Sequence, residues 1–214
     1  MLAGTRVKDA NCADGASLTV AEMEGRRQVL AIQALLRKHV PQHKLTLLGL
    51  PSRIGIRETR HVRCAWQVKG DDVLNGRRYD DAIANGSYRV DVHYQDKPGI
   101  LFKYLNGSQI YLRPGLPNEN ARWRPATPTN PTFYQIPYRA LLPQGGPPNL
   151  LLAGRMIDAD AEAHGALRVM VNMNQTGEAA GVAAVLALQC GVPVQQVDAG
   201  KLRATLAAGG SVML

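Results

Sequence analysis

The sequence predicts a mixed α/β fold of the α+β kind, and three observations support it. Apolar residues recur at helical spacing from residue 19 to 40. Short runs rich in β-branched and aromatic residues follow as far as Leu142. The stretch 149–191 then reads as a buried strand, a polar loop and a helix. We therefore expect three sections, with bounds 1–44, 45–148 and 149–214.

The composition limits the classes of function. The 214 residues carry a formal net charge of +8, and they suffice for one globular domain or two small ones. The basic residues are dispersed, so a solvated basic surface is the simpler interpretation and an anionic partner, nucleic acid included, is the alternative. An aromatic content of only 5% argues against a stacking platform for single-stranded nucleic acid.

Cysteine usage and hydropathy point to a soluble protein in a reducing compartment. Cys12, Cys64 and Cys190 are widely spaced and form no C-x-x-C pair, so neither a disulfide framework nor a metal site is expected. The first twenty residues show no signal-peptide pattern. The longest apolar run, 179–188, is shorter than the ~20 residues that span a bilayer. A cytoplasmic location without membrane contact is the expectation.

The first predicted element is an amphipathic helix. Thr19 followed by Glu22 forms a capping box, and Pro41 ends the helix. One face gathers Met23, Leu30, Ala31, Ala34 and Leu35. His39 and His43 have the spacing of a helical metal pair, but Pro41 between them argues against that site.

The middle section predicts strands and turns. We expect strands at 44–50 and 61–68, the second entered from a loop, and two short helical turns within 71–86. Residues 88–94 alternate between apolar and polar, as in a half-buried strand.

A hairpin is expected next, with Asn106 and Gly107 in a type I′ turn. The five prolines of 113–133 exclude a helix and disfavour a strand, which leaves a lid over a site or a surface insertion. Residues 133–143 predict a strand and a turn.

The end piece predicts part of a parallel, layered unit. Leu150–Ala153 is a continuous apolar run, as in a strand buried on both faces. The last helix is expected to start near Asn174 and to stop before Gly191, with Asn172 and Gln175 as a capping pair. One helical face carries small residues, which suits either close approach to another backbone or tight packing: Gly177, Ala180, Gly181 and Ala184.

Five stretches resemble the FAD-dependent oxidoreductase family whose flavin domain is of the glutathione-reductase type. They occur in the family's order and span about residues 17–206: SLTVAEMEGRRQVL, GIRETRHV, FYQIPYRALLP, NLLLAGRMIDADAEAHGALRVM and NQTGEAAGVAAVLAL. The sequence departs from family habit at Met156, Ile157 and Asp158, and at Asn172, where many relatives carry Cys.

The resemblance implies an FAD cofactor and hydride or electron transfer with a small-molecule substrate of unknown identity. It implies a β-rich substrate-side section over 45–148 and the C-terminal part of an FAD-binding domain over 149–214. The chain contains no G-x-G-x-x-G, the fingerprint that cradles the FAD pyrophosphate in that family. We therefore expect a C-terminal portion that binds FAD weakly or not at all and is inactive alone, with a complementing N-terminal half or a homo-oligomer as partner.

The resemblance and the position of the motifs together imply cofactor contacts. Gly154, Arg155 and Asp158 follow the predicted strand, where ligands bind in open α/β sheets; an ion pair of Arg155 with Asp158 or Asp160 is the alternative. At the predicted helix N-terminus, Gln175, Thr176 and Gly177 are expected to stabilise the reduced flavin ring.

Catalytic candidates come from charge and from acid–base chemistry. Arg57 and Arg60 flank Glu58, and one arginine is expected to reach the flavin or an anionic substrate unless the cluster is an internal ion pair. His61 and His164 are the acid–base candidates, with surface or structural roles as the alternative. Tyr138 and Arg139 are expected on the substrate side.

Three functions remain open at this point. The first is a flavoenzyme portion, the second a non-catalytic association module, and the third an anion- or nucleic-acid-binding module that uses the charge of +8.

Overall fold

The computed structural model describes residues 5–43, 45–94 and 96–214. It divides into two compact units, the first ending at Arg60 and the second running from His61 to Leu214. Each unit is described by itself. The expected division into the sections 1–44, 45–148 and 149–214 stays a prediction, because those sections were defined by function and the two units are defined by their internal contacts.

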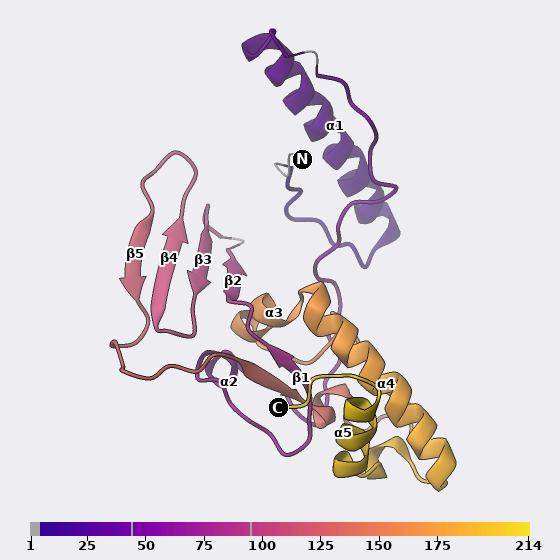
Figure 1. Cartoon of the computed structure of the whole chain (residues 1–214). Helices are drawn as coiled ribbons and strands as arrows, with labels where there is room; N and C mark the ends of the chain where they lie inside the picture. The colour runs from indigo at the N-terminus through magenta and orange to yellow at the C-terminus, as the bar shows by residue number, and fades with distance from the viewer. Residues whose placement is uncertain (1–4, 44, 95) are drawn as a thin grey trace. The chain divides into compact units, whose positions relative to one another are not determined.

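The first unit is built on one long helix, α1 (Gly15–His39), drawn in indigo in Figure 1. Asp14 caps it, because its carboxylate accepts the Ser17 N–H at 2.8 Å. The helix ends before Pro41, as expected. The capping box at Thr19 is wrong: the Thr19 hydroxyl donates to the Gly15 carbonyl inside the helix, so the helix begins four residues earlier.

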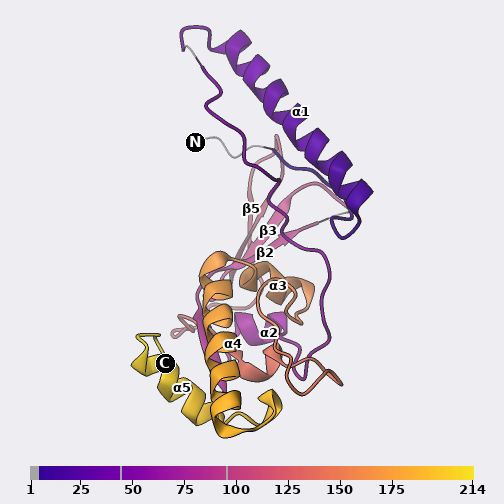
Figure 2. The ribbon, with the colours of Figure 1, turned by 90° about the vertical axis from the view of Figure 1, so that its right-hand side faces the viewer.

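Residues 45–60 return along α1 in an irregular extended form (Figures 1 and 2). The Ile54 N–H donates to Glu22 at 2.8 Å, and a Cβ at the buried Gly25 would lie 3.0 Å from an Ile54 methyl carbon. The strand predicted at 44–50 is wrong over 45–50, because this segment packs against a helix and has no neighbouring strand to pair with; Lys44 lies outside the described residues.

The second unit contains two antiparallel sheets. One pairs β1 (Ala82–Gly86) with β6 (Tyr134–Pro137). The other has the order β2-β3-β4-β5, formed by Val90–His93, Ile100–Lys103, Ser108–Leu112 and Glu119–Arg122. The mixed α+β class, the strand within 88–94, the hairpin and the strand within 133–143 are confirmed.

Several predictions in this section are wrong. Residues 61–68 make isolated bridges at Cys64 and Val68 and no strand, and the second predicted helical turn is β1. β5 forms within the proline-rich stretch, where Trp123 N–H and Arg122 bond back to the hairpin loop. The turn is not type I′, because only Gly107 of its two central residues has a positive φ, of 84°.

Helices cover the β1–β6 pair. α2 (Gly70–Leu74) and α3 (Ala161–Leu167) are short, whereas α4 (Met170–Cys190) and α5 (Ala199–Ala208) lie side by side (Figures 1 and 2). Single turns of 3-10 helix occur at Tyr138–Leu141 and Val194–Gln196. The core of this unit is fully buried at its centre, as at Ile83, Tyr134, Ile136, Leu167, Leu202 and Leu206.

The end piece differs most from expectation. Leu150–Ala153 is not a strand, and Leu150 is 41% exposed. The Leu150 N–H donates to the nearby Pro147 carbonyl, and the Leu152 N–H donates to the Leu141 carbonyl. The layered parallel unit is wrong, since the sheets of the described residues are antiparallel. α4 begins at Met170 and not near Asn174, although it ends at Gly191 in the left-handed conformation, as expected.

None of the helices among the described residues is both long and apolar enough to cross a membrane.

Candidate functional site

Two segments far apart in the sequence run together in the second unit and gather several of the predicted site residues. Residues 62–70 bond to residues 156–160 through the Val62, Val68 and Asp160 N–H groups, and the Val68–Ala159 bridge is parallel. This pairing places His61 beside the loop that carries Arg155 and Asp158.

Asp158 holds this pairing together. One carboxylate oxygen accepts the Cys64 N–H at 2.9 Å and the other accepts the Gln67 amide at 2.9 Å. The side chain is 9% exposed, and burial next to this carboxylate raises the pKa of the Cys64 thiol. Asp158 thus positions the 61–68 segment, and its oxygens are already used within the chain.

His61 and His164 meet, although 102 residues separate them in the sequence. Their ring centroids lie 4.6 Å apart in an edge-to-face arrangement. His164 comes from α3 and is 2% exposed, whereas His61 is exposed and its Nδ1 lies 2.9 Å from the Ile157 carbonyl oxygen. Because that oxygen only accepts, Nδ1 of a neutral His61 carries the proton and Nε2 is the basic nitrogen.

The residues expected at the N-terminus of the last helix lie further along it. Gln175 accepts the Asn85 N–H at 2.9 Å and donates to the Asn85 carbonyl at 3.0 Å, and so holds α4 against β1. Thr176 is fully buried, and its hydroxyl oxygen is 3.4 Å from the Gly154 N–H. Thr176 is therefore beside Gly154. The predicted placement of Gln175, Thr176 and Gly177 at a helix N-terminus beside the end of a strand is wrong, because the helix starts at Met170 and Leu150–Ala153 is not a strand.

Asn172 does not cap the helix; its buried side chain links α4 to other segments through hydrogen bonds. Its amide donates to the Tyr134 hydroxyl at 3.0 Å and to the Ala166 carbonyl at 3.1 Å. Burial in turn raises the pKa of Tyr134 well above its usual range. The residue connects α4 to β6 and to the end of α3, which explains why α4 starts before it.

Two glycines leave the backbone open near Thr176. Gly154 has a φ of +96°, and no heavy atom of the described residues lies within 4 Å of the place where its Cβ would stand. The same space is open at the exposed Gly177. An L side chain would intrude on this surface, so a flat ligand can approach the backbone at both points. Arg155 is exposed next to Gly154, and its Nε donates to the Arg168 carbonyl at 3.4 Å.

The cofactor candidates thus divide into two groups. The backbone of Gly154 and Gly177 is open to a ligand, and Arg155 is exposed beside it. The side chains of Asp158, Gln175 and Thr176 form hydrogen bonds within the chain and hold the neighbouring segments in place.

Tyr138 and Arg139 serve the interior of the second unit. The Tyr138 hydroxyl donates to the Val194 carbonyl at 2.8 Å, and burial raises its pKa to about 12. Arg139 forms an ion pair with Asp81 at 2.9 Å, and its guanidinium carbon lies 4.5 Å from the centre of the Trp66 ring. These contacts give both residues structural partners.

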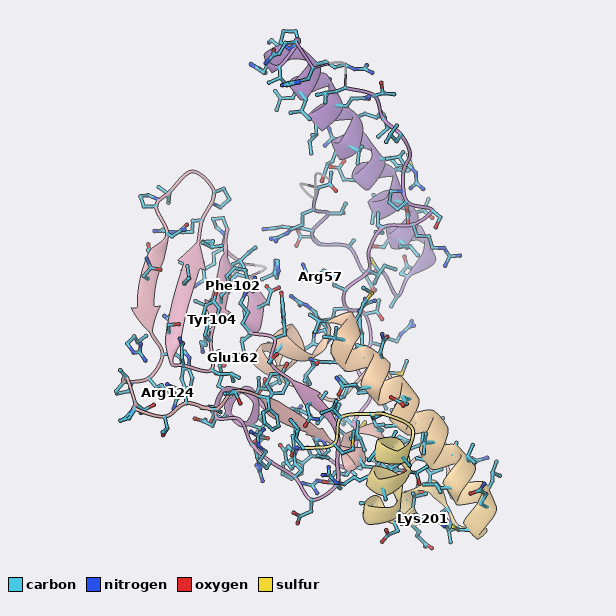
Figure 3. The ribbon with its side chains drawn as sticks, viewed as in Figure 1. Arg57, Phe102, Tyr104, Arg124, Glu162 and Lys201 are labelled. Carbon is cyan, nitrogen blue, oxygen red and sulfur yellow. The ribbon has the colours of Figure 1, made fainter. Side chains whose placement is uncertain are left out.

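The sheet formed by β2–β5 also combines an arginine stacked on an aromatic ring with an ion pair, as Arg139 does. Arg89 lies 4.1 Å from the centre of the Phe102 ring, and Lys103 forms an ion pair with Glu162 of α3. Figure 3 labels Phe102 on the sheet and Glu162 on α3. The pair ties α3 to the sheet.

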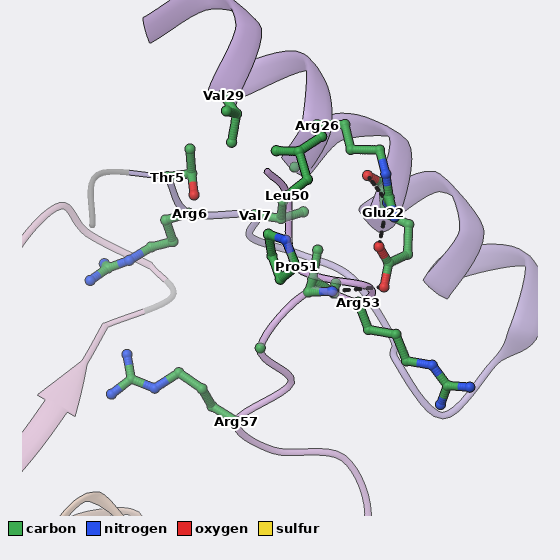
Figure 4. A pocket seen from close by; sticks show the side chains of 13 residues that line it. Thr5, Arg6, Val7, Glu22, Arg26, Val29, Leu50, Pro51, Arg53 and Arg57 are labelled. Atoms are coloured by element: carbon green, nitrogen blue, oxygen red, sulfur yellow. Dashed lines mark hydrogen bonds and ion pairs between the residues drawn. The ribbon is translucent and has the colours of Figure 1, made fainter. Parts of the chain in front are cut away.

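Arg57 and Arg60 belong to the first unit. Arg60 donates to the Ala13 carbonyl at 3.1 Å. Arg57 lines a cavity of about 470 Å³ (Figure 4). Sequence reasoning missed its other basic residues, Arg6, Arg26 and Arg53, because they stand in three separate segments.

Comparison with known families and proteins gives one match. No curated protein and no solved structure matches the chain. The family model described as FAD dependent oxidoreductase matches residues 2–206, almost the whole chain, in agreement with the five motifs. The chain belongs to the FAD dependent oxidoreductase family.

Proposed function

We propose that this protein works in hydride or electron transfer between FAD and a small-molecule substrate. Membership of the FAD dependent oxidoreductase family over residues 2–206 carries the proposal. FAD supplies the redox chemistry when bound, and the protein supplies position and electrostatics.

The surface at Gly154 and Gly177 is the proposed flavin contact. With no side chain at either position, the ring system and the ribityl chain can approach the backbone closely. Arg155 adds a positive charge, which favours an anionic reduced ring or a phosphate. Thr176 and Gln175 are positioning residues, because they hold Gly154 and β1 in place.

His61 and His164 are the proposed acid–base pair. The Ile157 carbonyl fixes the proton of a neutral His61 ring on Nδ1, and Nε2 is the nitrogen that we propose accepts a proton from a substrate. His164 packs edge-on against this ring and restricts its orientation. Arg57 is the candidate for an anionic substrate group.

The absence of a G-x-G-x-x-G motif from the sequence leads to a test of this proposal. Backbone N–H groups of that motif bind the pyrophosphate, and the sequence contains no such motif. If the chain contacts the flavin ring and ribityl chain alone, riboflavin should bind as well as FAD, and ADP should not compete.

Quenching of flavin fluorescence by the full chain measures this directly. We expect riboflavin and FAD to have dissociation constants within roughly threefold of each other, a difference below about 1 kcal/mol. Gly177→Val should abolish both signals while the circular dichroism spectrum of the protein stays native. Absence of quenching by the wild-type chain, or competition by ADP, would contradict the proposed contact.

The location of the protein in the cell is part of the proposal. Cys12, Cys64 and Cys190 are free thiols, which supports a reducing compartment such as the cytoplasm.

A further inference from the structure

One side of α1 is apolar and exposed. Figures 1 and 2 show residues 45–60 along one side of the helix, and Ala21 and Gly25 of α1 are buried. The helical repeat places on the opposite side a set of exposed residues, which we call the exposed apolar face: Val20, Met23, Leu30, Ala31 and Ala34. Its three large side chains are each more than half exposed. The apolar face expected from the sequence thus exists, but in the part of the chain that is described it faces solvent.

The exposed apolar face has the spacing of a helix–helix contact. Val20, Arg27 and Ala34 are seven residues apart, as are Met23 and Leu30, a repeat that keeps two lines of side chains on one side of a helix. A small residue such as Ala34 lets two helix axes approach closely. The 25 residues of α1 hold about three such repeats, the length at which a heptad pattern begins to indicate helix pairing.

Arg27 lies at the centre of this face, and its charge is balanced within the helix. Its Nε and one Nη atom donate to the Glu24 carboxylate at 2.6 Å and 2.8 Å. The guanidinium is therefore held by Glu24, while the methylene stem of the side chain can pack against apolar groups. A partner helix can cover this position without leaving an unpaired charge.

Charge is divided along α1 and the segment before it. Residues 9–24 contain acidic side chains but no lysine or arginine, and residues 25–43 contain lysine and arginine but no acidic side chain. Both glutamates of α1 pair with arginines inside the helix. Exposed charge remains at the two ends, with Asp14 at the first and Arg37 and Lys38 at the last. A second α1 meets opposite charge at both ends if it is antiparallel, and like charge if it is parallel.

We propose that two copies of this chain associate through α1, with the two helices antiparallel. The two exposed apolar faces cover each other, which removes their side chains from water. Asp14 comes near the partner's Lys38, and the two-fold axis repeats this contact at the other end. The association requires no flavin, so its failure and the failure of the redox proposal are separate results.

Sedimentation equilibrium of the full chain tests the association. We expect a reversible equilibrium of monomer and dimer with a dissociation constant on the order of 10 μM. No larger species should form, because a two-fold contact uses the same face of both copies and closes at two. Added salt should weaken the dimer, since the charged ends are exposed. A monomer at all concentrations up to about 100 μM, or assembly beyond the dimer, would overturn the proposal.

Matched variants test the position of the contact. Leu30→Glu and Met23→Glu should each raise the dissociation constant roughly tenfold or more, because each places a carboxylate in the covered face. Leu188→Glu is the control, since Leu188 is 84% exposed on α4 of the second unit, and it should leave the dimer unchanged. Helical circular dichroism confirms that each variant is folded. An unchanged dimer in Leu30→Glu, or an equal loss in Leu188→Glu, would place the contact elsewhere and overturn the assignment.

A charge reversal tests the direction of the helices. In an antiparallel pair, Lys38→Glu places a carboxylate near the partner's Asp14 and should raise the dissociation constant roughly threefold or more. In a parallel pair the same change removes repulsion between like charges and should strengthen the dimer. Lys201→Glu, on α5, is the control with the same change of net charge and should have no effect. A stronger or unchanged dimer in Lys38→Glu would contradict the antiparallel arrangement.

Discussion

Gly177 and Gly181 stand one turn apart on α4, and both are exposed with open space at the Cβ position. A glycine inside a helix costs about 1 kcal/mol of stability relative to alanine. No described residue requires the missing side chain at either position, and our proposal gives contact with a ligand as the reason at one of them. The flavin proposal assigns that role to Gly177, which is next to Thr176 and Gly154.

This pair gives a prediction with an internal control. Gly177→Ala and Gly181→Ala should each raise the free energy of unfolding of the flavin-free chain by about 0.5–1 kcal/mol. Only Gly177→Ala should also weaken riboflavin binding. Urea denaturation and fluorescence titration measure the two effects, and equal weakening by both variants would move the contact away from Gly177.

Asp158 provides a second prediction at the residue scale. Asp158→Ala leaves the Cys64 N–H, in a buried segment, without its acceptor, at a cost of about 1–3 kcal/mol. Gln67→Ala removes only an exposed partner of the same carboxylate and should change stability by less than about 0.5 kcal/mol. If Asp158→Ala and Gln67→Ala lowered the free energy of unfolding in urea by similar amounts, the hydrogen bond from the Cys64 N–H would not be the stabilising contribution of Asp158.

The thiols should differ in reactivity. Burial raises the pKa of Cys64, so its thiolate fraction at neutral pH is reduced, and Cys190 is exposed. Iodoacetamide should therefore modify Cys190 before Cys64 in the native protein. Mass spectrometry of partially labelled protein follows the order, and first labelling of Cys64 would contradict the buried placement.

At the scale of elements, α1 has two candidate N-cap residues, Asp14 from the structure and Thr19 from the sequence, and a pair of variants distinguishes them. Asp14→Ala should destabilise the helix by about 1 kcal/mol, because it removes the acceptor of the Ser17 N–H. Thr19→Ala should have less than half of this effect, since Thr19 is exposed inside the helix. Thermal unfolding followed by helical circular dichroism compares the two, and the reverse order would restore the capping box read from the sequence.

Elements with a local signal could be predicted from the sequence. The periodicity of α1, the alternation in β2 and the Asn106–Gly107 turn are all carried by neighbouring residues. β1 could not be predicted this way, because its buried side chains pair with β6 about fifty residues later. The start of α4 was missed for a similar reason: Asn172 resembles a cap, but its amide bonds to Tyr134.

The candidate site shows the same limit. Gly154, Thr176 and Gly177 were chosen because they belong to stretches that resemble the family, and Gly154 and Thr176 do lie in contact. Their contact with a flavin stays a prediction. The meeting of His61 with His164 depends on the pairing of 62–70 with 156–160, a contact that no local pattern encodes. The arginine cavity depends in the same way on two segments, 5–7 and 50–57, that converge on α1.

At the scale of the whole molecule, the two units carry different chemistry. The second unit has open backbone at Gly154 and Gly177, where we propose the flavin contact. The first unit has a cavity lined by four arginines and one glutamate, so part of the formal charge of +8 is gathered there.

The central claim, that the backbone at Gly154 and Gly177 contacts the flavin, is tested most directly by amide chemical shifts. In a riboflavin titration of the isotope-labelled chain, the Gly154 and Gly177 N–H signals should shift most. Those of Gly145 and Gly210, which like Gly154 have a positive φ, should stay in place. If riboflavin binds and the Gly154 and Gly177 signals do not move, the flavin contact lies elsewhere and the account is wrong.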